Sequence, residues 1–164
     1  MARKSTPGGT PATKVLHQAG VPFTVHSYEH DPGTTTFGTE AADELGVDPQ
    51  RIFKTLVCTI DARPPFAVAV VPVSGQLDLK AFASALGIKK AAMAEPTAAA
   101  RATGYVVGGI SPLGQRTALP TVIDASAQSF ATIFVSAGKR GLQIELSPAD
   151  LCSLSGASFA AVGT

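Results

Sequence analysis

Two apolar runs joined by a short polar link constrain the fold of this chain more than any other feature. Ile52 to Ile60 and Phe66 to Val73 are rich in β-branched and apolar residues, and Asp61 to Pro65 joins them. Runs of this length, bounded by turn residues, are typical of paired strands in the core of a sheet. The sequence therefore predicts two paired core strands.

A lysine interrupts the first run. In a strand that begins at Ile52, the two-residue period places Lys54 on the same face as Ile52 and Leu56. An unpaired ammonium group in the interior is costly, or it is neutralised. Lys54 therefore either extends along its stem to water or holds a ligand phosphate or ester oxygen in a pocket, and the pattern alone leaves both interpretations open.

Local start and stop signals predict further helices and strands. Helices are expected over residues 11–19, 39–45, 78–86, 95–102 and from 147, and strands over 23–28, 88–93, 105–107, 121–125, 131–136 and 142–146. Short helices among strands without repeated βαβ units predict an α+β fold, with a mixed, curved, barrel-like sheet surrounded by short helices. We expect one domain over residues 10–164, preceded by a flexible tail over residues 1–9.

Composition limits the partners. The chain of 164 residues carries a formal net charge of +1, whereas proteins that hold nucleic acid through many phosphates are strongly basic. Contact with RNA is therefore expected to be local or assisted, and no DNA partner is expected. The longest apolar stretch, Phe66 to Val73, is too short to cross a bilayer, and no secretion signal is evident. These features predict a cytoplasmic protein with no membrane partner.

Two glycine-containing segments are candidate ligand loops. The paired glycines of Gly108 to Gly114 permit unusual backbone angles and let main-chain N–H groups approach a ligand, as in an oxyanion or phosphate cradle. Ser136 to Gly141 is a basic connection that suits a charged turn or a contact with an RNA backbone. Glycine-rich links between strands are often plain turns, so both interpretations remain open for each segment.

The sequence gives little support for metal binding or covalent catalysis. His26 and His30 lie on a strand that runs into a turn, where their spacing does not place two ligands on one face, so no metal site is expected. No Gly-x-Ser-x-Gly motif occurs, and Cys58 and Cys152 are flanked mainly by apolar or small residues, like core side chains. We expect no enzyme nucleophile and no cofactor.

Several segments in the same order resemble the YbaK branch of the aminoacyl-tRNA editing domains associated with synthetases. They are His26 to Pro32, Phe37-Gly38, Phe53 to Leu56, Pro72 to Lys80, Thr103 to Tyr105, Gly108 to Gln115 and Ser136 to Leu142. The resemblance implies a barrel-like sheet with surrounding helices, related to the editing insertion of prolyl-tRNA synthetases. It also implies a trans-acting enzyme that deacylates Cys-tRNA(Pro), with the tRNA 3′ end as partner.

The resemblance assigns roles to individual residues. Lys54 is implied to anchor the terminal adenosine or its phosphate, and the loop after Gly108 to fix the aminoacyl carbonyl through its backbone. The implied catalytic residues are Lys54, Gly108, Gly109, Ile110 and Ser111. The implied substrate-binding residues are Tyr28 and Phe37 on the adenosine side, Thr55 beside the lysine, and Pro112, Ser136, Gly138 and Gln143.

In this family the bound cysteine is thought to attack its own ester through its thiol, releasing a cyclic thiolactone and free tRNA. That route agrees with the lack of an enzyme nucleophile and makes proximity the main catalytic effect. One departure concerns Gln143, which stands where the resemblance leads us to expect an acidic residue.

Two other functions remain open. The same pocket with water as nucleophile would hydrolyse alanyl or other small aminoacyl esters. Alternatively, the domain is a non-catalytic module that binds a tRNA 3′ end or a synthetase. A further hypothesis is that a prolyl-tRNA synthetase docked on the same tRNA assists tRNA selection, because the net charge is only +1.

Overall fold

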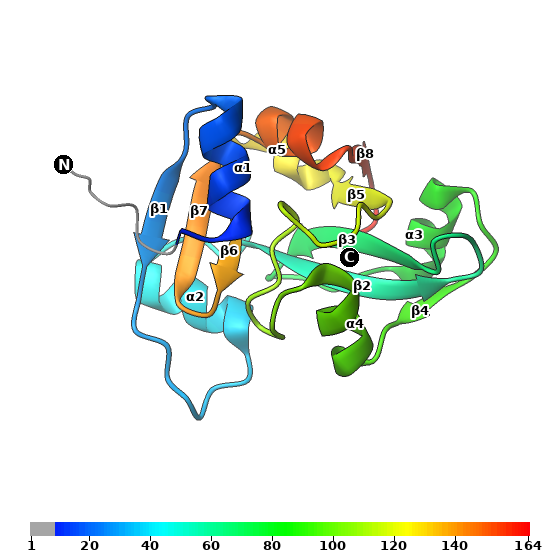
Figure 1. Ribbon diagram of the computed structural model, residues 1–164, viewed down its shortest axis with the longest axis horizontal. Helices are drawn as coiled ribbons and strands as arrows, with labels where there is room; N and C mark the ends of the chain where they lie inside the picture. The colour runs from blue at the N-terminus through cyan, green and yellow to red at the C-terminus, as the bar shows by residue number, and fades with distance from the viewer. Residues whose placement is uncertain (1–8) are drawn as a thin grey trace.

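The computed structural model describes residues 9–164, so the tail expected over residues 1–9 lies outside the described residues except for Gly9 (Figure 1). Helices and strands alternate irregularly along the chain. In order they are α1 (Pro11–Ala19), β1 (Thr24–Ser27), α2 (Phe37–Leu45), β2 (Phe53–Ile60), β3 (Phe66–Pro72), α3 (Leu79–Leu86), β4 (Ala91–Met93), α4 (Pro96–Thr103), β5 (Thr121–Asp124), the 3-10 helix η1 (Ala125–Ser129), β6 (Ile133–Lys139), β7 (Leu142–Leu146), α5 (Pro148–Ser155) and β8 (Ser158–Ala160).

The strands form two sheets. One is three-stranded and antiparallel, in the order β1-β7-β6, and the other is five-stranded and mixed, in the order β4-β2-β3-β5-β8. The sheets meet where Ile52 bridges Phe134 in parallel, and there the Phe134 N–H donates to the Arg51 carbonyl at 2.9 Å. The predicted α+β fold with a mixed sheet and short helices is confirmed. The strands do not close into one barrel, because they divide between two sheets joined at this bridge.

The predicted pair of core strands is confirmed. β2 and β3 are antiparallel, with Phe53 opposite Pro72 and Thr59 opposite Phe66. Successive side chains of β2 point to opposite faces, and both faces are covered. Val57 packs in one apolar cluster and the fully buried Cys58 in another. Because it is packed on both sides, β2 is a rigid support for the side chains that it carries.

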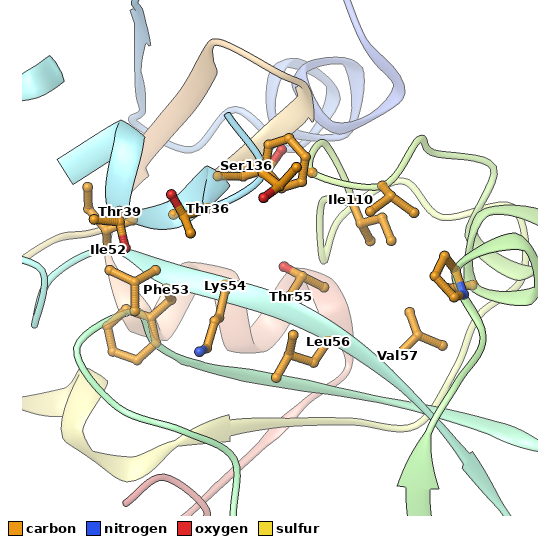
Figure 2. A pocket seen from close by; sticks show the side chains of 18 of the residues that line it. Thr36, Thr39, Ile52, Phe53, Lys54, Thr55, Leu56, Val57, Ile110 and Ser136 are labelled. Atoms are coloured by element: carbon orange, nitrogen blue, oxygen red, sulfur yellow. The ribbon is translucent and has the colours of Figure 1, made fainter. Parts of the chain in front are cut away.

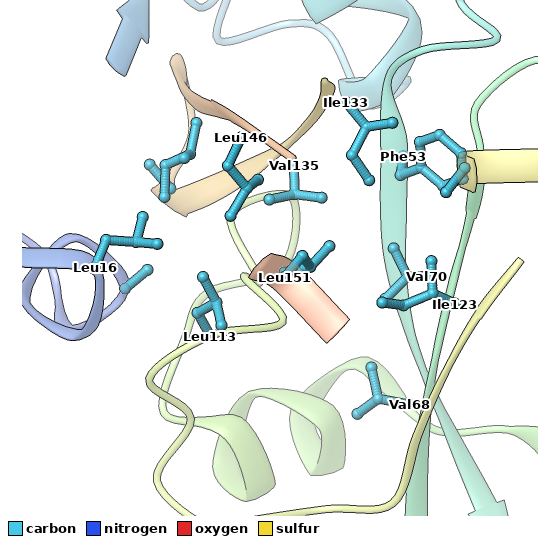
Figure 3. Close-up of a cluster of buried hydrophobic side chains, with 14 of the residues drawn as sticks. Leu16, Phe53, Val68, Val70, Leu113, Ile123, Ile133, Val135, Leu146 and Leu151 are labelled. Atoms are coloured by element: carbon cyan, nitrogen blue, oxygen red, sulfur yellow. The ribbon is translucent and has the colours of Figure 1, made fainter. Parts of the chain in front are cut away.

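The largest apolar cluster joins the two sheets and the helices α1 and α5 (Figure 3). Leu16 of α1, Val135 of β6, Ile123 of β5 and Leu151 of α5 all belong to it and are fully buried. Burial of apolar area contributes roughly 25 cal/mol per Å². This cluster therefore fixes the three-stranded sheet against the five-stranded one.

Capping explains the helix starts that the sequence predicts. The Thr10 hydroxyl accepts from the Thr13 N–H at 3.3 Å at the start of α1. The Ser147 hydroxyl accepts from the Asp150 N–H at 3.1 Å before α5. Each contact satisfies a main-chain donor that the helix itself leaves unpaired. α2 begins at Phe37, slightly before the expected residue 39.

The strand predicted over residues 105–107 is wrong. Tyr105 follows the end of α4 and is buried, and its hydroxyl donates to the Leu113 carbonyl at 2.6 Å. Gly104 and Gly108 bracket the segment with positive φ angles of 82° and 85°, so the chain turns instead of extending. The structure also contains η1 and β8, which local sequence signals did not predict.

Candidate functional site

A pocket of about 440 Å³ opens along one edge of β2 (Figure 2). Its walls come from the start of α2, the β4–α4 region, the loop after α4, and the three-stranded sheet. The lining residues are Thr35, Thr36, Phe37, Gly38, Thr39, Ile52, Phe53, Lys54, Thr55, Leu56, Val57, Val73, Met93, Ala94, Pro96, Ala99, Val107, Gly108, Ile110, Ser136 and Gln143.

The hydrogen-bond pattern of β2 explains why the pocket lies there. In an antiparallel ladder each residue directs its N–H and C=O to the same neighbouring strand. The Ile60 N–H donates to Pro65 on the β3 side at 2.9 Å, and the Val57 carbonyl accepts from Ala94 on the other side at 3.0 Å. Thr55, an even number of residues from Val57, therefore directs its main chain away from β3. β6 touches this edge at its start and β4 at its end, and the pocket occupies the gap.

Lys54 lines the pocket and is half-buried. Its Nζ donates to the Gly75 carbonyl at 2.9 Å, and burial lowers the pKa of the ammonium group. Figure 2 shows the Lys54 side chain leaving β2 on the side opposite to the Thr55 hydroxyl. The lysine is therefore held at the edge of the pocket by one main-chain carbonyl, and two of its three donors remain for a ligand.

Thr55 and Gln143 bring polar atoms into the pocket wall. Figure 2 shows the Thr55 hydroxyl directed toward the side on which Ser136 and Ile110 lie. Gln143, 7% exposed, lies on β7, where it pairs with Ser136 of β6. Thr55 Oγ1 and Gln143 Oε1 are both buried, and neither has a hydrogen-bond partner among the described residues. Buried polar atoms are rarely left unpaired in native proteins, so each of these two atoms is available to a water molecule or to a ligand group.

A bulge in β6 positions Ser136. The β6–β7 register shifts between Ser136 and Lys139, and the Ser136 Oγ accepts from the Gly138 N–H at 3.1 Å. Gly138 has a φ of 104°, and a Cβ there would lie 2.6 Å from the ring of Tyr105. Gly138 is not among the residues that line the pocket, but its positive φ allows the turn that orients Ser136 toward the pocket.

The glycine loop contributes two residues to the pocket. Gly108 and Ile110 line it. Gly109 packs against the backbone of Lys139 and Arg140. Ser111 is fully buried and accepts from the Leu113 N–H at 3.3 Å, and Pro112 is buried as well. Gly109, Ser111 and Pro112 are thus not lining residues, and their contacts support the loop.

The two aromatic residues expected on the adenosine side lie in different places. Phe37 lines the pocket, and a Cβ on Gly108 would lie 2.7 Å from its ring. The guanidinium carbon of Arg140 is 4.8 Å from the same ring centroid. Tyr28 does not line the pocket; it packs beside the small cluster that contains Ile52, and burial raises the pKa of its phenol.

Sequence reasoning missed the hydroxyl groups contributed by Thr35, Thr36 and Thr39. No role was predicted for these residues, which line the pocket because α2 starts beside the edge of β2. That contact joins distant segments and leaves no local signal. Met93, which is 51% exposed, also lines the pocket and had no predicted role.

Lys54 is the single ionisable side chain among the described residues that line the pocket. Elsewhere in residues 9–164, no cluster of three or more His, Cys, Asp or Glu side chains is arranged to hold a metal ion. Burial raises the pKa of the Cys58 thiol to about 11, and the Cys152 thiol donates to the Ala157 carbonyl at 3.1 Å. Within the described part of the chain, no helix combines the length and hydropathy needed to cross a bilayer.

Solved structures share this fold. One, described as a proposed trans-editing enzyme for prolyl tRNA synthetase, superposes with a TM-score of 0.82 at 24% identity, over 97% of this chain and 98% of the other. A second, the hypothetical protein APE2540, gives a TM-score of 0.83 at 23% identity, over 94% and 100% of the two chains. These superpositions show that the chain shares the α+β fold of these two proteins.

Sequence comparison identifies the family. The family model for the aminoacyl-tRNA editing domain matches residues 31–154. The chain is also 41% identical over 165 residues to EbsC of Enterococcus faecalis (strain ATCC 700802 / V583), whose name describes a proposed Cys-tRNA(Pro)/Cys-tRNA(Cys) deacylase. That alignment covers 100% of this chain and 99% of EbsC. The chain belongs to the aminoacyl-tRNA editing domain family, which confirms the resemblance found in the sequence.

Proposed function

We propose that this protein is a trans-acting editing enzyme that deacylates mischarged aminoacyl-tRNA, with Cys-tRNA(Pro) as its preferred substrate. Membership of the editing family supports an aminoacyl ester as substrate. The 41% identity to EbsC over the whole chain supports cysteine as the amino acid. The partner on this proposal is the 3′ end of the mischarged tRNA.

The chemical make-up of the pocket is the observation that carries this proposal. Lys54 is its single ionisable group, and no cysteine, histidine or carboxylate from the described residues lines it. Among the described lining residues, no histidine or carboxylate is present to activate the hydroxyl of Ser136 or of a threonine, and Lys54 leaves β2 on the side opposite to the Thr55 hydroxyl. A site of this kind positions its ligand and leaves the ligand to supply the nucleophile, which the thiol of cysteine provides.

The reaction on this proposal balances without a further reactant. The cysteine thiol loses its proton, and its sulfur bonds to the carbonyl carbon of the same aminoacyl ester. The ester C–O bond then breaks, the tRNA ribose oxygen takes up a proton, and a cyclic thiolactone leaves. The thiol and the carbonyl belong to the same aminoacyl group, so the attack is intramolecular and the site contributes by holding the two groups in a reactive orientation.

The residues at the pocket divide the work as follows on this proposal. Lys54 turns its ammonium group from Gly75 to the phosphate or ribose of the terminal adenosine, because its flexible stem lies at the open edge of β2. Gly108 and Ile110 present main chain to the ester carbonyl. Phe37 offers part of its ring to the adenine, and Gly109, Ser111, Pro112, Gly138 and Tyr28 hold these groups in place from outside the pocket.

The test is to incubate the purified protein with Cys-tRNA(Pro) and to identify the released small molecule by mass spectrometry. The Lys54→Ala variant is expected to lose about 100-fold or more of the rate, the scale of removing one positioned electrostatic group. Lys80→Ala, an exposed lysine on α3, is the matched control and should keep full activity. Release of free cysteine instead of thiolactone would show that water, and not the substrate thiol, is the nucleophile. Absence of any released product would favour a non-catalytic binding module.

A prolyl-tRNA synthetase assists tRNA selection on this proposal. The net charge of +1 gives the isolated protein little attraction for a polyanion. A gel shift at physiological salt should therefore show weak binding of tRNA(Pro) alone and a complex when the synthetase is added. Strong, tRNA-specific binding by the isolated protein would contradict this assistance.

A further inference from the structure

Thr55 and Gln143 are the two residues whose buried side-chain oxygen atoms lack a hydrogen-bond partner in residues 9–164. They come from different sheets, β2 and β7, and both line the same pocket. An isolated orphan atom has many explanations, but two orphans at one pocket indicate a shared ligand group. The amide oxygen of glutamine accepts hydrogen bonds only, and the threonine hydroxyl both accepts and donates.

The chemistry of the surrounding wall narrows the ligand group. The pocket contains no carboxylate among its described lining residues, so the group is held by neutral hydrogen bonds and not by an ion pair. Both orphan atoms are screened from solvent, which suits a small donor group. A nucleobase would instead be expected to stack on an aromatic ring such as that of Phe37, which lies beside Gly108 and under the exposed Arg140.

We infer that Gln143 and Thr55 recognise the α-amino group of the aminoacyl end, with the amine N–H donating to Gln143 Oε1 and the Thr55 hydroxyl completing the contact. The inference rests on the proposed function, because it takes an aminoacyl ester as the ligand. It makes the α-amino group a condition of binding. These two residues are specificity determinants and take no part in bond making.

Two unreactive adenosine analogues test the inference by binding alone. One carries cysteine as an amide on a 3′-amino-3′-deoxyadenosine, and the other carries 3-mercaptopropionate, which lacks only the α-amino group. Isothermal titration should show at least about tenfold tighter binding of the cysteinyl analogue, the discrimination typical of a site with polar groups that are left unpaired by the wrong ligand. Equal affinities for the two analogues would overturn the inference.

Substitutions locate the effect. Gln143→Met and Thr55→Val remove the polar atoms with little change of volume, and each should bring the affinity for the cysteinyl analogue close to that of the 3-mercaptopropionyl analogue. Affinity for the 3-mercaptopropionyl analogue should stay unchanged, whereas a merely structural defect would weaken both. Gln128→Met and Thr59→Val, at exposed positions, are the matched controls and should keep the preference.

Because the two residues lie on different sheets, the second variant still tests the inference if the first variant does not fold. If both variants keep the wild-type preference for the cysteinyl analogue, the inference is wrong. The deacylation assay with Cys-tRNA(Pro) is separate. A protein that prefers the cysteinyl analogue but releases nothing would refute the proposed activity and leave amine recognition standing.

Discussion

The guanidinium carbon of Arg140 lies 4.8 Å from the centroid of the Phe37 ring, over a side chain that lines the pocket. Arg140 Nε donates to the Val107 carbonyl at 2.8 Å, and the side chain is otherwise exposed. A guanidinium group over an aromatic face is attracted by the ring quadrupole. The arginine is therefore held at the pocket rim with terminal donors facing solvent.

We predict that Arg140 contacts a phosphate next to the terminal nucleotide of the tRNA. Arg140→Ala should raise KM several-fold, and the salt dependence of kcat/KM should weaken by about 0.7 in logarithmic slope, the value for one contact to a single strand. Arg63→Ala, in the exposed link between β2 and β3, serves as the control. If Arg140→Ala leaves the salt dependence of kcat/KM unchanged, the predicted phosphate contact does not exist.

Gly108 should not tolerate a side chain. Its φ is 85° and a Cβ would lie 2.7 Å from the Phe37 ring, whereas Gly87 has a φ of 72° and open space around it. Gly87→Ala should cost about 1–2 kcal/mol of unfolding free energy from the left-handed backbone alone. Gly108→Ala should cost more and also lower kcat/KM, since Phe37 must move. Thermal unfolding and kinetics on both variants measure the difference, and equal effects would contradict it.

The two cysteines should be dispensable for catalysis. Burial holds the pKa of the Cys58 thiol near 11, so little thiolate exists at neutral pH. Cys58→Ala should lower the melting temperature, because the side chain is fully buried, while kcat/KM stays close to wild type. Cys152→Ala should retain most activity as well. Loss of activity in both folded variants would exclude the self-attack route.

Asp124 should stabilise the protein in a pH-dependent way. Burial by itself raises the pKa of this carboxyl, but hydrogen bonds from Ser126 and from the Gly163 and Val162 N–H groups outweigh it and hold the pKa below its ordinary value. A carboxyl with a lowered folded-state pKa stabilises the fold above its unfolded pKa of about 4 and loses that contribution as the pH falls through the folded value.

The Asp124→Asn variant tests this effect. It should lose about 1–3 kcal/mol of unfolding free energy at pH 7, because hydrogen bonds to a charged acceptor become hydrogen bonds to a neutral one. The difference from wild type should shrink as the pH falls below about 4, because the unfolded carboxyl takes up a proton there while the folded carboxyl, with its lowered pKa, is still ionised. Denaturant titrations at pH 7 and pH 3 measure it, with exposed Asp61→Asn as the control. A difference that is equal at both pH values would contradict the assignment.

The sequence predicts local structure well because its signals are local. Thr10 and Ser147 cap helices as expected, and β2 and β3 pair as their apolar runs indicate. The division into two sheets is a long-range property, set by contacts such as Ile52 with Phe134. The strand predicted at Tyr105 is wrong because Gly104 and Gly108 turn the chain there, and the apolar run does not mark a buried strand, since Tyr105 is buried but Val106 is 57% exposed.

For the candidate site, too, local features could be predicted from the sequence and long-range contacts could not. Lys54 stands out in the sequence because a charge interrupts an apolar strand, but the Gly75 carbonyl that holds it is remote in the chain. The resemblance to editing domains brings in Thr55 and Gln143, and the structure adds that both carry unpaired buried atoms. Neither local sequence signals nor the resemblance connects Thr35 and Thr39 with the pocket, because their position depends on how α2 docks beside β2.

The gap in the edge of β2, between its contacts with β6 and β4, has a consequence for solubility. A strand edge with unused N–H and C=O groups is a template on which another chain can add a strand. Thr35 and Thr36, in the threonine run before α2, line the pocket at this gap and are expected to hinder the approach of another chain. Shortening the loop that carries Thr35 and Thr36 is therefore expected to cause aggregation as well as loss of ligand contacts. The open strand edge that makes room for a substrate thus limits how short this loop can be.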